Sequence, residues 1–191
     1  MDMEKKKLLL IGNNELSDDF SSIINEYDMV VRVNRMTNYE NCKGKTDLWL
    51  CDVHPVALEL YEKEEPKKKF TDAKSAIIFR HSISGSKYFL DKIGYKGSTK
   101  IINFNVPWIK AYIPSYQWNG GFRVTNSFWM LIYCLNNFRE DYEISILGIG
   151  DRSYLDSEEH KFHRLIFKEE QALLERLINE KVIKSLDFNN I

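Results

Sequence analysis

Short, wholly apolar runs alternate along this chain with longer stretches whose apolar residues recur at helical spacing. A short apolar run between two helices is typical of a strand that is buried on both faces of a sheet. We therefore predict strands at Lys7–Ile11, Met29–Val33, Thr46–Cys51, Ala76–Phe79, Lys100–Asn105, Glu143–Gly148 and Val182–Phe188. The helical spacing predicts helices at Glu15–Tyr27, Pro55–Glu64, Ser84–Ile93, Asn126–Phe138 and Phe162–Glu180.

This alternation of strands and helices predicts an α/β fold. We expect a Rossmann-like domain with a mostly parallel sheet and helices on both faces. The 191 residues suffice for one well-packed core, so residues 1–191 are predicted to form a single domain. The least regular stretch, Val106 to Val124, is expected to be a long loop. Its aromatic residues either anchor that loop to the surface or offer a stacking surface to an acceptor.

The first predicted strand leads directly into Gly12, Asn13 and Asn14, and a helix is expected a few residues later. A strand, a turn and a helix N-terminus in this order can bring backbone N–H groups to a phosphate. Gly12 also permits close approach of a ligand to the backbone. The two asparagines are equally explained as turn formers. Neither a G-x-G-x-x-G motif nor a P-loop motif is present.

The second predicted strand ends in Arg32, Val33 and Asn34, about twenty residues further on. Alternation places the Arg32 and Asn34 side chains on the same face. A charged side chain on a central strand needs either an anionic ligand or a structural carboxylate, such as Asp28 or Asp47. Asn34, at the exit of the strand, is the stronger candidate for a ligand contact.

Two later segments also carry candidate ligand-binding residues. Thr125, Asn126 and Ser127 precede an amphipathic helix, where Thr125 or Asn126 is a plausible N-cap and where the helix N-terminus can also hold an anion. Gly150 and Asp151 follow the strongly apolar strand at Glu143–Gly148. Ligands in such sheets bind outside the carboxyl ends of the strands, so these residues are predicted to lie beside the Gly12 turn.

Two histidines, His160 and His163, lie just before the last predicted helix. An H-x-x-H pair near carboxylates can bind a metal, but the three or four converging ligands of such a site are not evident. A neutral imidazole that acts as a general base is the better interpretation. The alternative for His163 is a surface histidine that flanks a helix. We predict no metal site.

The overall composition excludes some classes of binding partner. Lys and Arg total 27 against 28 Asp and Glu, so nucleic-acid binding through net charge is not expected. The three cysteines are widely spaced and odd in number, which is typical of reduced thiols. No segment approaches the ~20 apolar residues of a membrane span. From these features we expect a cytoplasmic protein.

Taken in order, these motifs resemble those of the sialyltransferases in glycosyltransferase families 29 and 42. The resemblance extends over nearly the whole chain. Its motifs are the Gly12-Asn13 turn, Arg32-Val33-Asn34, the G-x-x-T-D-like stretch Gly44 to Asp47, Thr125-Asn126-Ser127, Leu147 to Asp151, and His163 followed by Glu169, Leu173, Leu174 and Leu177. Ser127 stands where the family motif has a glycine, and the spacing from His163 to Glu169 is one residue longer than in the family.

The resemblance implies transfer of a sugar, sialic acid from a CMP-activated donor, to a glycan acceptor. It implies an inverting, metal-independent displacement with His163, or alternatively His160, as the base. The residues implied to hold the nucleotide are Gly12, Asn13, Asn14, Arg32, Asn34, Thr125, Asn126, Ser127, Gly150 and Asp151. Two alternatives stay open at this point: a transferase that uses another nucleotide sugar, and a non-catalytic nucleotide-binding module, which the altered motif at Ser127 suggests.

Overall fold

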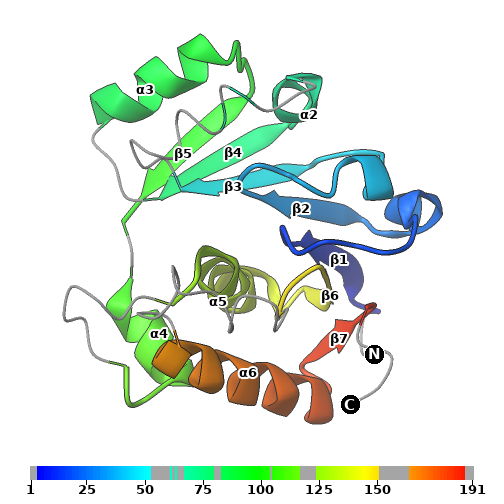
Figure 1. The fold of residues 1–191 in the computed structure, drawn as a ribbon, viewed down its shortest axis with the longest axis vertical. Coiled ribbons are helices and arrows are strands. Elements are labelled where there is room, and N and C mark those ends of the chain that lie inside the picture. Colours follow the sequence, from blue (N-terminus) through cyan, green and yellow to red (C-terminus); the bar gives the residue numbers. More distant parts are fainter. Residues whose placement is uncertain are drawn as a thin grey trace.

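The fold is built on one parallel sheet of seven strands (Figure 1). The computed structural model describes residues 4–52, 61, 63, 67–79, 83–103, 105–116, 124–150 and 164–187. The strands are β1 (Lys6–Ile11), β2 (Met29–Val33), β3 (Leu48–Asp52), β4 (Ser75–Phe79), β5 (Ser98–Ile102), β6 (Tyr142–Leu147) and β7 (Ile183–Ser185). Every predicted strand is present, with differences only at the ends. The predicted α/β class and the parallel sheet are confirmed.

The strand order reverses once, and this reversal locates the ligand edge. The order is β5-β4-β3-β2-β1-β6-β7, so the chain winds outward from β1 to β5 and then returns to the other side of β1. Both neighbours of β1 pair with it in parallel, through Leu10 to Val31 on β2 and Leu10 to Ile146 on β6. The β1–β6 boundary is therefore the topological switch point, where α/β sheets of this kind bind their ligands.

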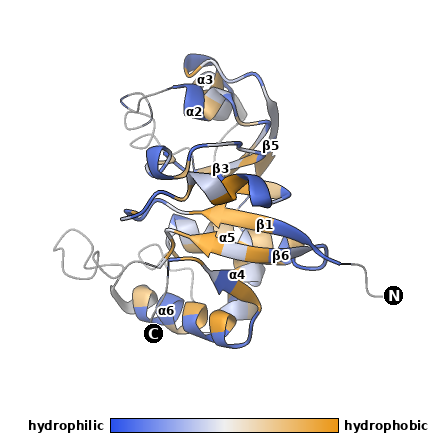
Figure 2. Ribbon diagram, turned by 90° about the vertical axis from the view of Figure 1, so that its right-hand side faces the viewer, coloured by the Kyte–Doolittle hydropathy of each residue, from blue (hydrophilic) through white to orange (hydrophobic). Residues whose placement is uncertain are grey.

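Helices cover both faces of the sheet because the central strands are apolar on both faces. Helices α4 (Val106–Tyr112), α5 (Asn126–Phe138) and α6 (Arg164–Asn179) pack on the face that carries Leu8 and Leu10. The other face is covered by η1 (Ser21–Glu26), η2 (Glu40–Cys42), α2 (Lys68–Thr71) and α3 (Ile83–Lys92). Figure 2 shows the apolar stretches of β1 and β6 at the centre of these layers, and α6 with hydrophobic and hydrophilic residues along its length.

The prediction of a helix at Glu15–Tyr27 is wrong. Only the short 3-10 helix η1 forms there, and residues 15–20 are irregular. The polar side chains satisfy local groups instead: Asp19 accepts a hydrogen bond from the Ser21 backbone N–H at 2.8 Å, and Ser17 donates to Asp18 at 3.1 Å. Ser and Asp compete with helical hydrogen bonding in this way. No α-helix N-terminus therefore follows the Gly12 turn.

The prediction of an irregular loop from Val106 is also wrong in its first part. Helix α4 begins at Val106, with Pro107 in its first turn, where proline suits a helix start. Trp108 packs on Trp129 of α5 with the ring centroids 5.8 Å apart, which fixes α4 against the core. Residues 117–123 and most of the predicted helix at Pro55–Glu64 lie outside the described residues. The helix predicted at Asn126–Phe138 is confirmed with the same bounds.

Candidate functional site

The turns that follow β1 and β6 interlock at the switch point. The Gly12 N–H donates to the Leu147 carbonyl at 2.7 Å, and the Asn14 N–H donates to the Gly148 carbonyl at 3.1 Å. A Cβ at position 12 would lie 2.0 Å from the Gly148 oxygen, so only glycine fits there. The sequence predicted that Gly12 permits close approach of a ligand, whereas the group that lies close to Gly12 in this structure is the second turn.

Asn38 supports the turn after β1 through side-chain hydrogen bonds, a role that the sequence did not indicate. This side chain is 4% exposed. Its amide donates to the Gly12 carbonyl at 3.0 Å and also to the Asn14 carbonyl. Thr37 adds a hydrogen bond from its hydroxyl to the Asn13 carbonyl at 2.9 Å. The loop after β2 thus fixes the loop after β1, and the Asn13 and Asn14 side chains are left partly exposed at the carboxyl edge.

Asn34 leaves β2 in a left-handed conformation, with φ of +45°, which asparagine tolerates better than most residues. Its carbonyl accepts from the Trp49 indole at 2.7 Å, and its side-chain oxygen accepts from the Asp52 N–H at 3.1 Å. Asn34 therefore joins the ends of β2 and β3. Among the described residues none accepts a hydrogen bond from its Nδ2, and the residue is partly exposed.

Arg32 is buried, with 1% of its surface exposed, and its donors are used within the protein. The guanidinium donates to the Thr46 hydroxyl at 3.0 Å, to the Cys42 carbonyl at 2.6 Å and to the Cys42 Sγ at 3.1 Å. The Tyr39 ring lies 5.3 Å from it. These contacts connect β2 to the η2 segment. Arg32 therefore supports the carboxyl edge of the sheet from inside the protein, and its guanidinium does not face the candidate site.

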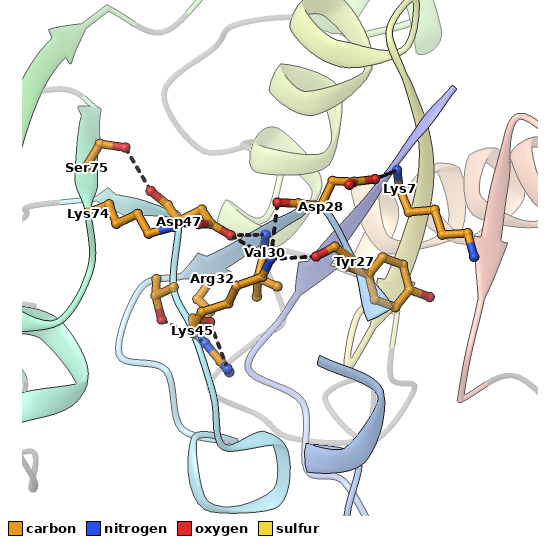
Figure 3. A network of polar contacts seen from close by, with 10 residues as sticks. Lys7, Tyr27, Asp28, Val30, Arg32, Lys45, Asp47, Lys74 and Ser75 are labelled. Carbon is orange, nitrogen blue, oxygen red and sulfur yellow. Dashed lines mark hydrogen bonds and ion pairs between the residues drawn. The ribbon is translucent and has the colours of Figure 1, made fainter. Parts of the chain in front are cut away.

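The carboxylates suggested as partners of Arg32 act elsewhere. Asp47 accepts from the Val30 N–H at 2.9 Å and pairs with Lys74, while Asp28 accepts from the Lys7 N–H at 2.7 Å (Figure 3). Both carboxylates therefore hold the amino ends of strands, and the prediction that either orients Arg32 is wrong. Asp47 thus has a structural role at the start of β2.

The N-terminus of α5 is fixed by a buried acid. Thr125 is the N-cap, and its hydroxyl accepts from the Phe128 N–H at 3.4 Å. Glu170 of α6 is fully buried and accepts from the Thr125 N–H at 2.5 Å, with its second oxygen 3.2 Å from the Thr125 hydroxyl. Burial raises the pKa of Glu170 to about 8, although the two hydrogen bonds with Thr125 act in the opposite direction. Asn126 and Ser127 stay partly exposed in the first turn.

Helix α6 brings the α5 N-terminus and the β6 turn together. Gln171, the residue after Glu170, donates to the Gly150 carbonyl at 2.8 Å. Since adjacent residues of one helix contact Thr125 and Gly150, these two segments lie close to each other. The sequence predicted that the loop of Gly150 and Asp151 lies beside the Gly12 turn, and the hydrogen bond from the Asn14 N–H to the Gly148 carbonyl brings these two turns together. Asp151 itself lies outside the described residues. The buried acid of α6 is Glu170, whereas Glu169 is exposed and accepts from Ser115 at 2.7 Å.

Both candidate bases, His160 and His163, also lie outside the described residues. The segment that carries them joins Gly150, at the switch point, to Arg164, where α6 begins. The described residues contain no group of three or more metal-ligating side chains and no helix that is long and apolar enough to span a membrane.

A hollow of about 810 Å³ lies at the opposite end of the sheet, beside the amino ends of β6 and β7. Basic residues, among them Lys5, Arg139 and Lys181, contribute to its lining. Lys5 donates to the Arg139 carbonyl at 2.8 Å, just after the end of α5. Cations are favoured at helix C-termini, which accounts for this charge without a ligand.

The chain therefore has a Rossmann-like fold with partly exposed polar residues near its switch point, namely Asn13, Asn14, Asn126 and Ser127. Among solved structures it resembles a mammalian sialyltransferase, which was crystallised in complex with Gal-beta-1-3GalNAc-ortho-nitrophenol. The match has a TM-score of 0.62 and 14% sequence identity, and it covers 96% of this chain and 70% of the sialyltransferase chain. No protein-family model and no curated protein matches the sequence. The likeness establishes a sialyltransferase-like fold.

Proposed function

We propose that this chain is a glycosyltransferase that transfers sialic acid from a CMP-activated donor to a glycan acceptor. One observation carries the proposal: the reversal between β1 and β6 places the Gly12 turn, the Gly148 turn and the α5 N-terminus at one edge of the sheet. A solved structure with a similar fold is a mammalian sialyltransferase. The sequence motifs also resemble those of sialyltransferases.

In this proposal the nucleotide lies across the switch point. Gly12, Asn13 and Asn14 meet it from the β1 side, and Gly150 and Asp151 from the β6 side. Asn34 offers its Nδ2 donor. Thr125, Asn126 and Ser127 at the α5 N-terminus meet the donor's phosphate or carboxylate, because the helix dipole favours anions at a helix N-terminus. Arg32 keeps a supporting role.

The proposed chemistry is a direct displacement with His163 as the general base and His160 as the alternative. The base removes the proton from an acceptor hydroxyl as its oxygen attacks the anomeric carbon. The bond from that carbon to the phosphate breaks, and CMP leaves with the electron pair, which inverts the anomeric centre. Hydrogen bonds from the site stabilise the charge that develops on the phosphate, and no metal ion is required.

A thermal-shift panel of nucleotides tests the proposal most directly. A ligand bound only by the folded state stabilises it by RT ln(1 + [L]/Kd), about 2.7 kcal/mol at a hundredfold excess over Kd. CMP is expected to raise the melting temperature, and AMP, GMP and UMP are not. A response to UMP alone would favour a transferase for another nucleotide sugar.

The second candidate is a non-catalytic nucleotide-binding module, which Ser127 favours because the family motif has a glycine there. Release of CMP from CMP-sialic acid, measured with and without a panel of galactose-terminated oligosaccharides, separates the two functions. Acceptor-dependent release supports the transferase. Binding of CMP without release in any mixture supports the module.

A further inference from the structure

The turn that follows β6 is held at both of its ends by side chains from the last part of the chain. The Gly148 N–H donates to the Asp187 carboxylate at 2.7 Å. At the other end of the turn, the Gly150 carbonyl accepts from the Gln171 amide at 2.8 Å. Neither Asp187 nor Gln171 belongs to a motif that the sequence singled out.

The Asp187 carboxylate is itself oriented by its neighbours. Ser185 donates from its hydroxyl to the second oxygen of Asp187 at 3.1 Å. The Leu186 N–H donates to the Ile146 carbonyl at 3.0 Å, which continues the pairing of β7 with β6 beyond the strand. Leu186 also packs against the apolar cluster that contains Leu147. The edge strand thus delivers a carboxylate directly to the Gly148 N–H.

Gly148 connects Asp187 to the turn after β1, on the other side of the switch point. Its carbonyl accepts from the Asn14 N–H at 3.1 Å, and Gly148 has φ of +65°. A Cβ on Gly148 would lie 3.1 Å from the Asn38 amide nitrogen and 3.2 Å from the Asn14 carbonyl oxygen. The turn is therefore packed tightly against Asn14 of the first turn and against Asn38, which holds that turn. A change in the position of Gly148 must move Asn14 as well.

We propose that Asp187 and Gln171 are positioning residues, which hold the Gly148–Gly150 turn so that Asn14 and its neighbours are preorganised for the nucleotide. The identity of that ligand rests on the proposed function. The hydrogen bonds themselves do not. Groups held in place before binding lower the entropic cost of association, so loss of either anchor weakens affinity without removing a ligand contact.

Two matched substitutions at position 187 test the first anchor. In Asp187→Ala the Gly148 N–H loses its acceptor, whereas Asp187→Asn keeps an oxygen there and lacks the charge. Amide exchange at Gly148, followed by NMR without any nucleotide, is expected to accelerate roughly tenfold to a hundredfold in the alanine variant. The asparagine variant is expected to stay within about threefold of the parent, because its neutral hydrogen bond is only modestly weaker.

Calorimetry with CMP then measures the effect on the site. The Kd is expected to rise about tenfold in Asp187→Ala and in Gln171→Leu, with recovery in Asp187→Asn. Asp72→Ala, which removes an exposed carboxylate paired with Lys68 on α2, serves as the control and should bind like the parent. Melting temperatures of all variants show whether any loss of affinity is due to unfolding.

The two proposals fail in different ways. If Gly148 exchange in Asp187→Ala matches the parent, the anchor does not act and the inference is overturned. Accelerated exchange with unchanged CMP affinity overturns it as well, because the turn then does not prearrange the site. If the parent itself does not bind CMP, the proposed function fails. The exchange rates at Gly148 and Asn14 in the absence of ligand still decide whether Asp187 positions the turn.

Discussion

Glu170 on α6 accepts a hydrogen bond from the backbone N–H of Thr125, the N-cap of α5, at 2.5 Å. The carboxyl is fully buried, and burial raises its pKa to about 8. At neutral pH the group is therefore mostly uncharged in the folded protein. The Thr125 N–H donates to one oxygen of this carboxyl and the Thr125 hydroxyl donates to the other, so both oxygens have a partner in an apolar setting. One uncharged side chain thus fixes the helix start that faces the candidate site.

Glu170→Gln is expected to change the pH dependence of stability. The folded-state pKa of about 8 lies above the ordinary value of 4.5, so between these pH values the folded state holds a proton that the unfolded state has lost. Stability of the parent should fall as the pH rises through this window, by up to about 1.4 kcal/mol per pH unit from this group.

Urea unfolding at a series of pH values measures this slope. The glutamine variant should lack the Glu170 contribution, whereas Glu169→Gln, at the exposed neighbouring position, should keep it. Equal slopes in the parent and in Glu170→Gln would show that Glu170 is already charged in the folded protein.

Loss of the Asn34 amide is expected to weaken CMP binding by roughly 1–3 kcal/mol, because a hydrogen bond to the ligand is removed. Asn34 has φ of +45°, so Asn34→Ala also strains the backbone. Asn34→Gly removes the same amide and accepts this conformation, and it is the better variant for calorimetry. Unchanged affinity in Asn34→Gly would exclude Asn34 from the site.

His163→Ala is expected to lower turnover by about 10²–10⁴-fold, the usual effect of removing a general base. CMP affinity and melting temperature should stay close to those of the parent, because the base meets the acceptor hydroxyl and not the nucleotide. His160→Ala is the matched control. If His160→Ala loses turnover while His163→Ala does not, the base is His160. If both variants turn over like the parent, neither histidine is the base.

Chelation is expected to leave both CMP binding and sugar transfer unchanged. The proposed mechanism relies on hydrogen bonds to the leaving group, and the sequence contains no D-x-D motif of the kind that holds a metal against a sugar diphosphate. Transfer assays with EDTA, and with added Mn²⁺ or Zn²⁺, test this expectation. Activity that disappears with EDTA and returns with either metal would support the metal interpretation of His160 and His163.

Local patterns in the sequence determined the elements. The central strands are short apolar runs that are buried on both faces, whereas the edge strands β5 and β7 are partly exposed. The seven strands and the α/β class could be predicted without knowledge of any contact. Helix α5 has both an amphipathic pattern and the Thr125 cap, and its bounds were predicted correctly. The prediction of a helix at Glu15–Tyr27 was wrong because Ser21 and Asp19 form a local hydrogen bond that competes with the helix. The spacing of hydrophobic residues does not reveal such a competition.

Contacts between distant segments were decided only by the tertiary structure. Arg32 required a buried partner, but that the partner is the Cys42 carbonyl depends on how η2 folds back onto β2. Asn38, Glu170 and Asp187 carry no motif, and each acquires its role from a backbone group that the sheet brings next to it. The sequence specifies which side chains can form hydrogen bonds. The order of the strands decides which unpaired N–H and carbonyl groups lie within their reach, because buried backbone groups must be satisfied by whatever the fold places beside them.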